Sequence, residues 1–567
     1  MTESEIEARR SALDARNAPW TPRTLAGQLD HVADRHPDRP YIVVGDRSLT
    51  YREVAERSRI VAAGLLSLGL RRGDRVALLV DNRIEYPEIK FGIARAGAVA
   101  VPLNYSYKAD EIGERLRQSG ASIVIAVDAS AATDFLDAFD RLAPGWESGV
   151  ASTTIPDVRH VVLVRAHPGR DALDLGRLGD GGIARDEVDR RLAEIDPDDV
   201  CDIVFTSGTT GHALGAELTH DMVLRSAYGS AYHRAFADGW RISFALPLYH
   251  VFGYVEGMLS VLFVAGAIAP LRVFNPKTVL EVIERERINE VLFVPTMTVA
   301  VVDHAVKDPH DLSSLESVFS AAAPAPVWLW ERVLSDLAPR MVFTGYGQTE
   351  VSAATALTLP GDDIATVSAA VGTTKLGGIA TEGSDLPDGR LAEYRTVDPF
   401  SGEVLPAGET GELSVRGPQV TRGYYGDPER TAYSVDADGW LRTGDLGHID
   451  ERGYLRLDGR SSELFKVGGE LVAPLEVEQA LTGMAGVSQA FVAGIPDERF
   501  GEVGWAWVVP TEDAELDEHE LLRELRGHLA RFKVPRGITV TDAASLPVTT
   551  TGKVQKYLLV RSLSPTG

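Results

Sequence analysis

A run of hydroxyl residues and glycines follows an apolar segment near position 205. The segment Asp202-Ile-Val-Phe205 is typical of a buried strand, and it continues directly into Thr206-Ser207-Gly208-Thr209-Thr210-Gly211. Four hydroxyls and two glycines in six residues make a loop whose N–H groups and hydroxyls can surround a polyphosphate. It is not a Walker loop, because no Gly-Lys-Ser/Thr follows. On composition alone, a plain surface loop is an equally good interpretation.

Five further segments combine glycines with aromatic rings, carboxylates or lysines. They are PLYHVFG at 247–253, GYGQTE at 345–350, GWLRTGD at 439–445, the GR…GGELVAPLEVE segment at 459–478, and TTTGK at 549–553. Taken one at a time, such segments are more often structural. A histidine after Leu-Tyr is usually a satisfied core residue, and a Gly-Lys in a polar tail is usually solvated. The order of the six segments is therefore more informative than any one of them.

In this order and spacing, the six motifs resemble those of the ANL superfamily: acyl-CoA synthetases, peptide-synthetase adenylation domains and luciferases. The resemblance extends from about Leu25 to the C-terminus, and it is greatest to fatty-acyl- and aryl-CoA ligases. It implies an ATP-dependent ligase that joins a small carboxylate, or a similar oxyanion, to AMP with release of pyrophosphate. Transfer of the acyl group to the CoA thiol would follow.

The resemblance implies a nucleotide site built from several motifs. The loop at 206–211 would hold the β and γ phosphates, Tyr346 would lie against adenine, and Asp445 would accept the ribose hydroxyls. Glu350 would bind Mg²⁺, because a carboxylate oxygen is a hard ligand for a hard cation. The full set implied for the nucleotide is Thr206, Ser207, Gly208, Thr209, Thr210, Gly211, Ala323, Gly345, Tyr346, Gly347, Gln348, Thr349, Asp445 and Arg460.

The resemblance also implies which residues serve the two chemical steps. Lys553 would stabilise negative charge that develops at the α-phosphate. A small C-terminal domain would rotate about a hinge near 460–462 after adenylation. That rotation would bring Lys466, Gly468 and Gly469 to the path by which the CoA thiol enters.

The implied acyl pocket contains one unusual residue. His250 would act as a gate, and the remaining wall would come from Phe252, Glu256, Ala322 and Gly345. Glu256 stands where relatives tend to have a small or apolar group. Because an unpaired buried carboxylate is costly, one hypothesis is that Glu256 binds an amine or hydroxyl of the substrate. The alternative, that Glu256 turns outward to solvent, is equally good.

A second departure lies after the phosphate loop, where Ala213-Leu214-Gly215 replaces the usual Pro-Lys-Gly. Loss of that lysine predicts slower adenylation or compensation by another cation, since a charge-assisted contact contributes about 1.5–3 kcal/mol. With Glu256, it keeps two alternatives open. The scaffold could use another oxyanion or acceptor, as a nitrite-activating diazotase or an amide-forming ligase does, or it could be an inactive nucleotide-binding homologue.

These motifs need elements that position them, and the apolar pattern predicts alternating helices and strands. A helix-covered, mostly parallel sheet follows from that alternation. The predicted elements are helices at 25–35, 276–287, 475–482 and 515–530, a hairpin at 41–50, and strands at 75–80, 98–103, 291–294, 488–494 and 504–510. Between 372 and 458, short strands separated by Gly/Pro/Asp turns predict an antiparallel or barrel-like subdomain. The predicted division is a large domain at 1–459 and a small α+β domain at 460–567.

Composition excludes several classes of partner. Lys and Arg total 57 against 82 Asp and Glu, a formal charge of −25, which disfavours nucleic acid and anionic membranes. The single cysteine, Cys201, allows no intrachain disulfide and fits a reducing cytoplasm. The N-terminus is polar, and the longest apolar run, 257–271, is too short for a membrane helix and is interpreted as buried core. A carrier protein as acceptor and a homodimer remain alternatives.

Overall fold

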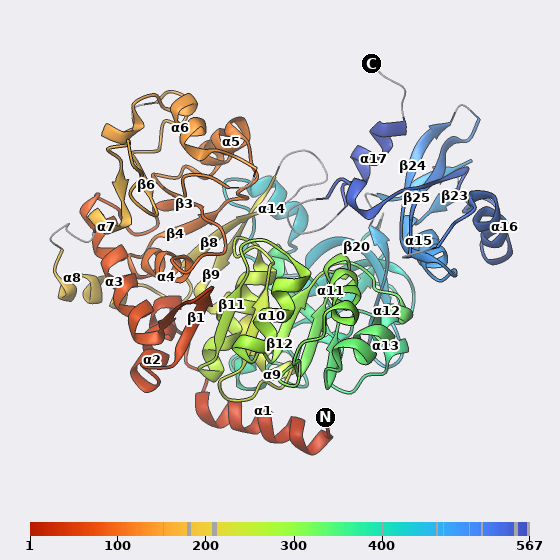
Figure 1. The fold of residues 1–567 in the computed structure, drawn as a ribbon, viewed down its shortest axis with the longest axis horizontal. Coiled ribbons are helices and arrows are strands. Elements are labelled where there is room, and N and C mark those ends of the chain that lie inside the picture. The colour runs from red at the N-terminus through yellow and green to blue at the C-terminus, as the bar shows by residue number, and fades with distance from the viewer. Residues whose placement is uncertain are drawn as a thin grey trace.

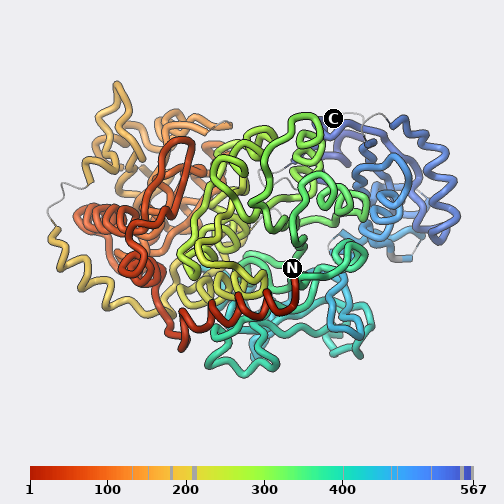
Figure 2. The backbone as a smooth tube through the Cα atoms, turned by 60° about the horizontal axis from the view of Figure 1, so that its bottom comes forward, coloured from red at the N-terminus to blue at the C-terminus, as the bar shows by residue number. Residues whose placement is uncertain are grey.

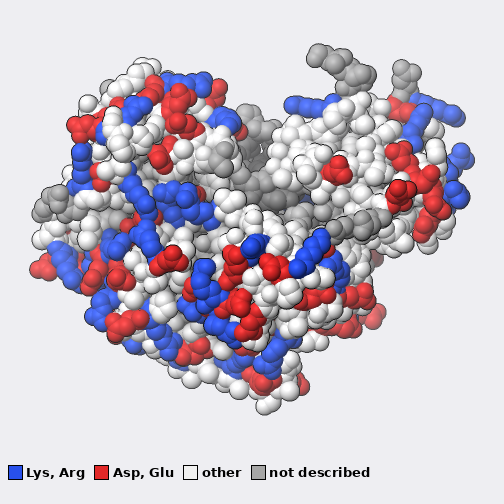
Figure 3. Space-filling view, viewed as in Figure 1, with Lys and Arg blue, Asp and Glu red and all other residues white. Residues whose placement is uncertain are grey.

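The computed structural model describes residues 1–567 except 131, 151, 179–182, 207–212, 400, 461–462, 469, 498, 512–513, 549–553 and 564–567. Figure 1 shows a large body that contains most of the chain and a smaller C-terminal body at the upper right. On the face in Figure 3, basic and acidic side chains are interspersed, so the negative net charge is not gathered into one patch there.

The first half of the chain builds a seven-stranded sheet in the order β7-β6-β5-β3-β4-β8-β9. All neighbours are parallel except β9, which runs antiparallel to β8. The strands are β3 (Arg75–Leu79), β4 (Val99–Pro102), β5 (Ile123–Ala126), β6 (His160–Leu163), β7 (Leu173–Asp174), β8 (Val200–Phe205) and β9 (Gly215–Thr219). The strand β8 delivers the chain directly to the predicted phosphate loop.

A second seven-stranded sheet has the order β14-β13-β12-β10-β11-β1-β2 and is parallel apart from the hairpin β1–β2. Its strands are β1 (Pro40–Val44), β2 (Arg47–Thr50), β10 (Arg241–Phe244), β11 (Ala267–Pro270), β12 (Glu290–Phe293), β13 (Ser317–Ser320) and β14 (Met341–Phe343). One hydrophobic core joins both sheets. The predicted helix-covered parallel sheet is therefore confirmed, as two sheets.

Helices cover these sheets, and side-chain caps fix where several of them begin. Thr24, Thr50, Thr219 and Asn275 each accept a bond from a backbone N–H three residues on. The helices are α1 (Glu3–Asn17), α2 (Leu25–Arg35), α3 (Tyr51–Ser67), α4 (Tyr86–Arg95), α5 (Ala109–Ser119), α6 (Phe135–Leu142), α7 (Leu175–Leu178), α8 (Arg185–Ala193), α9 (His220–His233), α10 (Pro276–Glu286), α11 (Pro295–Lys307), α12 (Val327–Arg332) and α13 (Ile364–Ala369). The helix α1, which the apolar pattern did not predict, lies across the large body in Figure 2.

The long apolar run is buried core, as predicted, but its conformation is irregular. The π-helix η2 (Phe252–Leu259) is followed by a 3₁₀ helix at Ser260–Val264 and then by β11. A π-helix is rare and is often found at a functional site. In the described part of the chain, the helices are all too short or too polar to cross a membrane.

Antiparallel strands follow the second sheet. Those within 372–458 were predicted from the turn-rich composition, whereas the two strands at 345–357 were not. A three-stranded sheet contains β15 (Gly345–Gln348), β16 (Ala353–Leu357) and β17 (Thr373–Thr374). A four-stranded sheet contains β18 (Glu393–Val397), β19 (Gly411–Arg416), β20 (Leu441–Ile449) and β21 (Leu455–Arg460), with α14 (Pro428–Ser434) between β19 and β20 in the chain.

The C-terminal body has its own core, which includes Val472, Val492, Val508 and Leu525. Its elements are β22 (Phe465–Val467), β23 (Glu470–Val472), α15 (Pro474–Thr482), β24 (Val487–Asp497), β25 (Gly501–Pro510), α16 (Glu518–His528), β26 (Gly537–Val540) and α17 (Lys556–Leu563). The two predicted strands extend into one long hairpin, whose arms pair from Val487 to Pro510.

Candidate active site

A cluster of polar side chains joins three of the predicted motifs, 345–350, 439–445 and 459–478. Asp445 on β20 accepts hydrogen bonds from Tyr346 Oη at 2.5 Å and from Gln348 Nε2 at 2.6 Å. Its other carboxylate oxygen lies 3.0 Å from Arg460 Nε. Gly347 on β15 lets β16 approach closely, because a Cβ at 347 would lie 1.8 Å from the Ala353 carbonyl oxygen. We name Tyr346, Gln348, Asp445 and Arg460 the Asp445 cluster.

Glu350 lies in the same motif, after Thr349, in a short 3₁₀ turn. Burial raises the pKa of Glu350, and Tyr424 Oη donates a hydrogen bond to its Oε1 at 3.0 Å. The backbone is fixed as well, because Thr421 N donates to the Glu350 carbonyl at 2.7 Å. Tyr424 belongs to none of the six motifs, so no sequence signal pointed to it.

Only the base of the predicted phosphate loop is described. Thr206 N donates to the Leu214 carbonyl at 2.8 Å, which closes the loop where β8 ends and β9 is about to begin. Gln118 Nε2 donates to the neighbouring Ala213 carbonyl at 2.7 Å. Ser207, Gly208, Thr209, Thr210 and Gly211 lie outside the described residues.

Several residues predicted for the acyl pocket lie at or near the start of the π-helix. Burial lowers the pKa of His250 to about 4, so its ring is neutral, and its Nδ1 accepts a hydrogen bond from Phe252 N at 3.2 Å. The Phe252 ring meets the ring of Phe319 edge-on, with centroids 5.1 Å apart. Gly345 is confined by Phe319 and Leu357, since a Cβ at 345 would lie 2.7 Å from a Leu357 methyl. His250 therefore carries no positive charge at neutral pH.

Two alanines follow β13, of which Ala322 was predicted for the acyl pocket and Ala323 for the nucleotide site. Ala322 and Ala323 are both exposed, and Ala322 has a φ of 74°, which is uncommon for a residue with a side chain. An L-residue held in such a conformation indicates that the surrounding structure fixes the turn. The exposure leaves both alanines accessible to a ligand.

Glu256 does not behave as either sequence hypothesis required. Its side chain is 1% exposed, so the solvent-facing alternative is wrong. Its Oε1 accepts from Ala354 N at 3.1 Å and lies 3.3 Å from Lys375 Nζ, and its Oε2 lies 3.1 Å from Arg234 Nη2. The premise of the other hypothesis, an unpaired carboxylate, is also wrong, because both oxygens already have charged protein partners.

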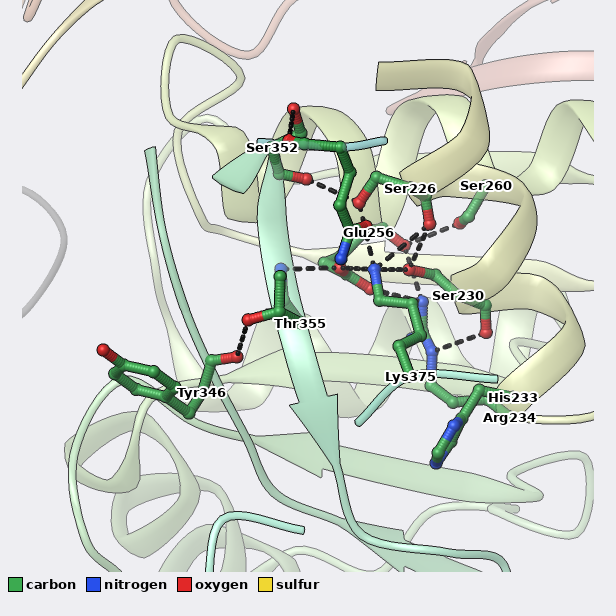
Figure 4. A network of polar contacts seen from close by, with 12 residues as sticks. Ser226, Ser230, His233, Arg234, Glu256, Ser260, Tyr346, Ser352, Thr355 and Lys375 are labelled. Carbon is green, nitrogen blue, oxygen red and sulfur yellow. Dashed lines mark hydrogen bonds and ion pairs between the residues drawn. The ribbon is translucent and has the colours of Figure 1, made fainter. Parts of the chain in front are cut away.

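These contacts belong to a larger buried network, shown in Figure 4. Arg234 also pairs with Glu290, which accepts a further bond from Ser317 Oγ at 2.8 Å. Lys375 Nζ donates to Ser226 Oγ at 3.0 Å and to Ser230 Oγ at 2.9 Å. We name Arg234, Glu256, Glu290 and Lys375 the Glu256 network.

The residues predicted for the second step lie on the C-terminal body. Lys466 is on β22 with its side chain exposed, and Gly468 follows in the turn with a φ of 60°. Among the described residues, neither forms a hydrogen bond or ion pair with the Asp445 cluster. Gly469, Lys553 and hinge positions 461 and 462 lie outside the described residues.

The arrangement offers carboxylate acceptors without a dedicated metal cage. In the part of the chain that the structure describes, no group of three His, Cys, Asp or Glu side chains could hold a metal ion. A cation bound by Glu350 would therefore take its other ligands from phosphates and water, as Mg²⁺ commonly does. The partly dehydrated Glu350 carboxylate fits that use, since a nearby cation would stabilise its charged form.

Two sequence models of one enzyme family match the chain. The model described as AMP-binding enzyme matches residues 29–425, and that of the AMP-binding enzyme C-terminal domain matches 476–553. The chain is 35% identical over 534 residues to the 3-[(3aS,4S,7aS)-7a-methyl-1,5-dioxo-octahydro-1H-inden-4-yl]propanoyl:CoA ligase of Mycobacterium tuberculosis (strain ATCC 25618 / H37Rv), covering 94% of this chain and 98% of that one. It is 32% identical over 544 residues to the putative acyl-CoA synthetase YngI of Bacillus subtilis (strain 168), covering 94% and 96%.

Solved structures have the same fold over nearly the whole chain. The crystal structure of the anthranilate CoA ligase AuaEII in complex with anthranoyl-AMP matches with a TM-score of 0.79 at 25% identity, covering 95% of this chain and 97% of that one. These matches confirm the resemblance that the six motifs indicated. The chain belongs to the ANL superfamily of adenylate-forming enzymes and is an AMP-forming ligase of the acyl-CoA synthetase type.

Proposed function

We propose that this enzyme activates a carboxylic acid with ATP as an acyl adenylate and then transfers the acyl group to the thiol of CoA. The observation that carries the proposal is the Asp445 cluster, in which Asp445 lies within hydrogen-bond reach of Tyr346, Gln348 and Arg460. A buried carboxylate held in this way can exchange its protein donors for the two ribose hydroxyls of a nucleotide.

We further propose that Glu350 binds Mg²⁺ together with the nucleotide phosphates. Bound Mg²⁺ would neutralise phosphate charge. Within the chain itself, Tyr424 orients the Glu350 carboxylate, and Thr421 N fixes its backbone. The neutral His250 and the Phe252 ring would line the acid site and keep water from it, since neither contributes a charge.

The remaining roles stay predictions from the family motifs. They are phosphate binding by the 206–211 loop, charge stabilisation by Lys553, and a thiol path along Lys466, Gly468 and Gly469. A domain division at 459/460 is supported by the separate C-terminal core. Cytoplasmic location, a carrier protein as acceptor and a homodimer are likewise predictions.

The test is pyrophosphate release with ATP and Mg²⁺ against a panel of aliphatic and aryl acids, each with and without CoA. We expect one class of acid to give release followed by a CoA thioester. Asp445→Asn should lower kcat/KM for ATP about 10- to 100-fold, the effect of losing a charge-assisted hydrogen bond of about 1.5–3 kcal/mol.

Asp458→Asn is the matched control, because Asp458 lies on the neighbouring β21 with partners His448 and Thr410 instead of the Asp445 cluster. Its activity should stay within about twofold of the wild type. Pyrophosphate release that requires no acid would contradict the proposal. Normal ATP kinetics in the Asp445→Asn variant would contradict it as well. Release that requires nitrite and an aryl amine, without thiol, would identify the diazotase alternative instead.

A further inference from the structure

The chain makes a strained bend immediately after Glu350. Ser352 and Ala353 have φ values of 56° and 87°, so two successive residues with side chains lie in the left-handed region. Each such residue is held in a sparsely populated conformation, and it persists only when its surroundings fix it. The bend joins the 3₁₀ turn Thr349–Val351 to β16, and Ser352 N donates back to the Thr349 carbonyl at 3.1 Å.

Three hydrogen bonds from other parts of the chain fix this bend. Ser226 Oγ on α9 donates to the Ser352 carbonyl at 2.6 Å, and Ser352 Oγ donates to the Gln419 carbonyl at 2.9 Å. On the far side of the bend, Ala354 N donates to Glu256 Oε1 at 3.1 Å. The bend is thus held at Ser352 and at Ala354, the residue that follows it.

Lys375 connects two of these three contacts. Its Nζ donates to Ser226 Oγ at 3.0 Å and lies 3.3 Å from Glu256 Oε1, the atom that accepts from Ala354 N. Figure 4 shows Lys375 and Glu256 pointing toward each other beside the serines of α9. Lys375 therefore fixes both the serine and the carboxylate that hold the bend.

The network can support this geometry because its charges are compensated. Glu256 and Lys375 are 1% and 0% exposed, and a buried charge without a partner would be strongly destabilising. Burial alone would raise the pKa of Glu256, but Lys375 and Arg234 lower it below its usual value. Burial lowers the pKa of Lys375 only to about 8, so the lysine is protonated at neutral pH.

We propose that Glu256 and Lys375 are positioning residues that hold the Ser352–Ala353 bend and thereby direct Thr349 and Glu350 toward the nucleotide. The inference rests on the proposed function of the Glu350 motif. It assigns to Glu256 a role in the adenylation step in place of the contact with the substrate acid that its sequence position suggested.

The test compares three isosteric or near-isosteric variants. Glu256→Gln and Lys375→Met remove the pair that fixes the bend. Glu290→Gln is the matched control, because Glu290 is equally buried and also pairs with Arg234, but its other partner is Ser317 on β13 and it does not contact the bend. All three variants remove one buried charge from the same network.

The first readout uses the enzyme without ligands. Hydrogen–deuterium exchange of a peptide that covers 349–356 should be at least tenfold faster in Glu256→Gln and Lys375→Met than in the wild type. Glu290→Gln should exchange within about twofold of the wild type in this peptide. The second readout is pyrophosphate release, where kcat should fall about 10- to 100-fold in the first two variants with the KM for the acid within twofold.

Several results would overturn the proposal. Unchanged exchange in Glu256→Gln and Lys375→Met would show that the pair does not hold the bend. An equal loss of kcat in Glu290→Gln would mean that any lost charge destabilises the region. A change confined to the KM of the acid would return Glu256 to the acid pocket.

A milder variant covers the case in which a charge variant does not fold. Ser226→Ala removes the bond to the Ser352 carbonyl without burying an unpaired charge, and it should also raise exchange in the 349–356 peptide. Normal exchange and kcat in Ser226→Ala would count against the proposal. If the wild type released no pyrophosphate with any acid, the proposed function would fail, but the exchange measurement would still decide the role of the pair.

Discussion

Two buried polar clusters each include a residue of the π-helix η2. They differ in the backbone elements that they connect. Tyr254 of η2 donates to Asp202 Oδ2 at 3.0 Å, and Asp202 pairs with Lys90 of α4. Glu256, two residues further along η2, belongs to the Glu256 network with Arg234 and Lys375. We name Lys90, Asp202 and Tyr254 the Asp202 cluster.

The difference lies in what each cluster connects. The Asp202 cluster ties η2 to two regular elements, since Lys90 is on α4 and Asp202 is on β8. The Lys90 ammonium lies 4.6 Å from the centre of the Tyr254 ring, and within the described part of the chain none of the three side chains bonds to strained backbone. The Glu256 network instead supplies hydrogen bonds to irregular backbone, the bend at 352–353. The comparison indicates that a buried pair between regular elements mainly stabilises the fold. A pair that holds strained backbone mainly fixes the geometry of a site.

The largest effect on stability is expected from breaking the Asp202 cluster. Asp202→Asn leaves Lys90 buried without a counter-charge, which should lower the free energy of unfolding by about 3–5 kcal/mol. Urea unfolding followed by tryptophan fluorescence measures this change. Asp198→Asn is the control, because Asp198 is 69% exposed and its pair with Arg422 should contribute at most about 1 kcal/mol. An equal loss of unfolding free energy in the two variants would show that the buried Asp202 cluster stabilises the fold no more than an exposed ion pair does.

An intermediate effect is expected on acidification, because a neutral histidine lies near each cluster. Burial lowers the pKa of both His220 and His233 to about 3. The unfolded chain takes up their protons near pH 6.5 and the folded chain does not. The contribution of the two neutral histidines to the free energy of unfolding is therefore fully present above pH 6.5. It falls as the pH drops toward 3, by about 1.4 kcal/mol per pH unit for each histidine.

Unfolding midpoints between pH 7.5 and 5 should therefore shift less in His220→Asn and in His233→Asn than in the wild type. Similar changes in the two variants would assign the acid sensitivity to burial, which the two histidines share. A slope that neither substitution alters would refute this explanation.

The smallest effect is expected when the whole Asp202 cluster is replaced by apolar groups of similar volume. The triple variant Lys90→Met, Asp202→Leu, Tyr254→Phe should unfold within about 1 kcal/mol of the wild type, because no buried charge or hydroxyl is left without a partner. The same measurement as for Asp202→Asn tests it. A triple variant as unstable as Asp202→Asn would show that packing, and not the unpaired charge, sets the stability of this region.

Local sequence predicted several elements well because the signals were strong within a few residues. Thr24 caps α2, and the helix runs over Leu25–Arg35 as predicted. The helix α1 was not predicted, since it buries only Ile6 and Leu13 among its apolar residues. It is held instead by long-range polar contacts, such as Arg9 with Glu316 and Asp14 with Tyr228. No local pattern contains such contacts.

The sequence by itself determined the family, the helix-covered parallel sheets and the motifs that are proposed to form the nucleotide site. Motif order, through the family resemblance, singled out Asp445 and Glu350 as candidate residues for the nucleotide and Mg²⁺. Tertiary structure alone decided the partners of Glu256. Lys375 and Arg234 lie 119 and 22 residues from it in the chain, and they reach its carboxylate only after folding. The physical reason is that residue type can indicate a buried charge, whereas the position of its counter-charge depends on how distant elements pack.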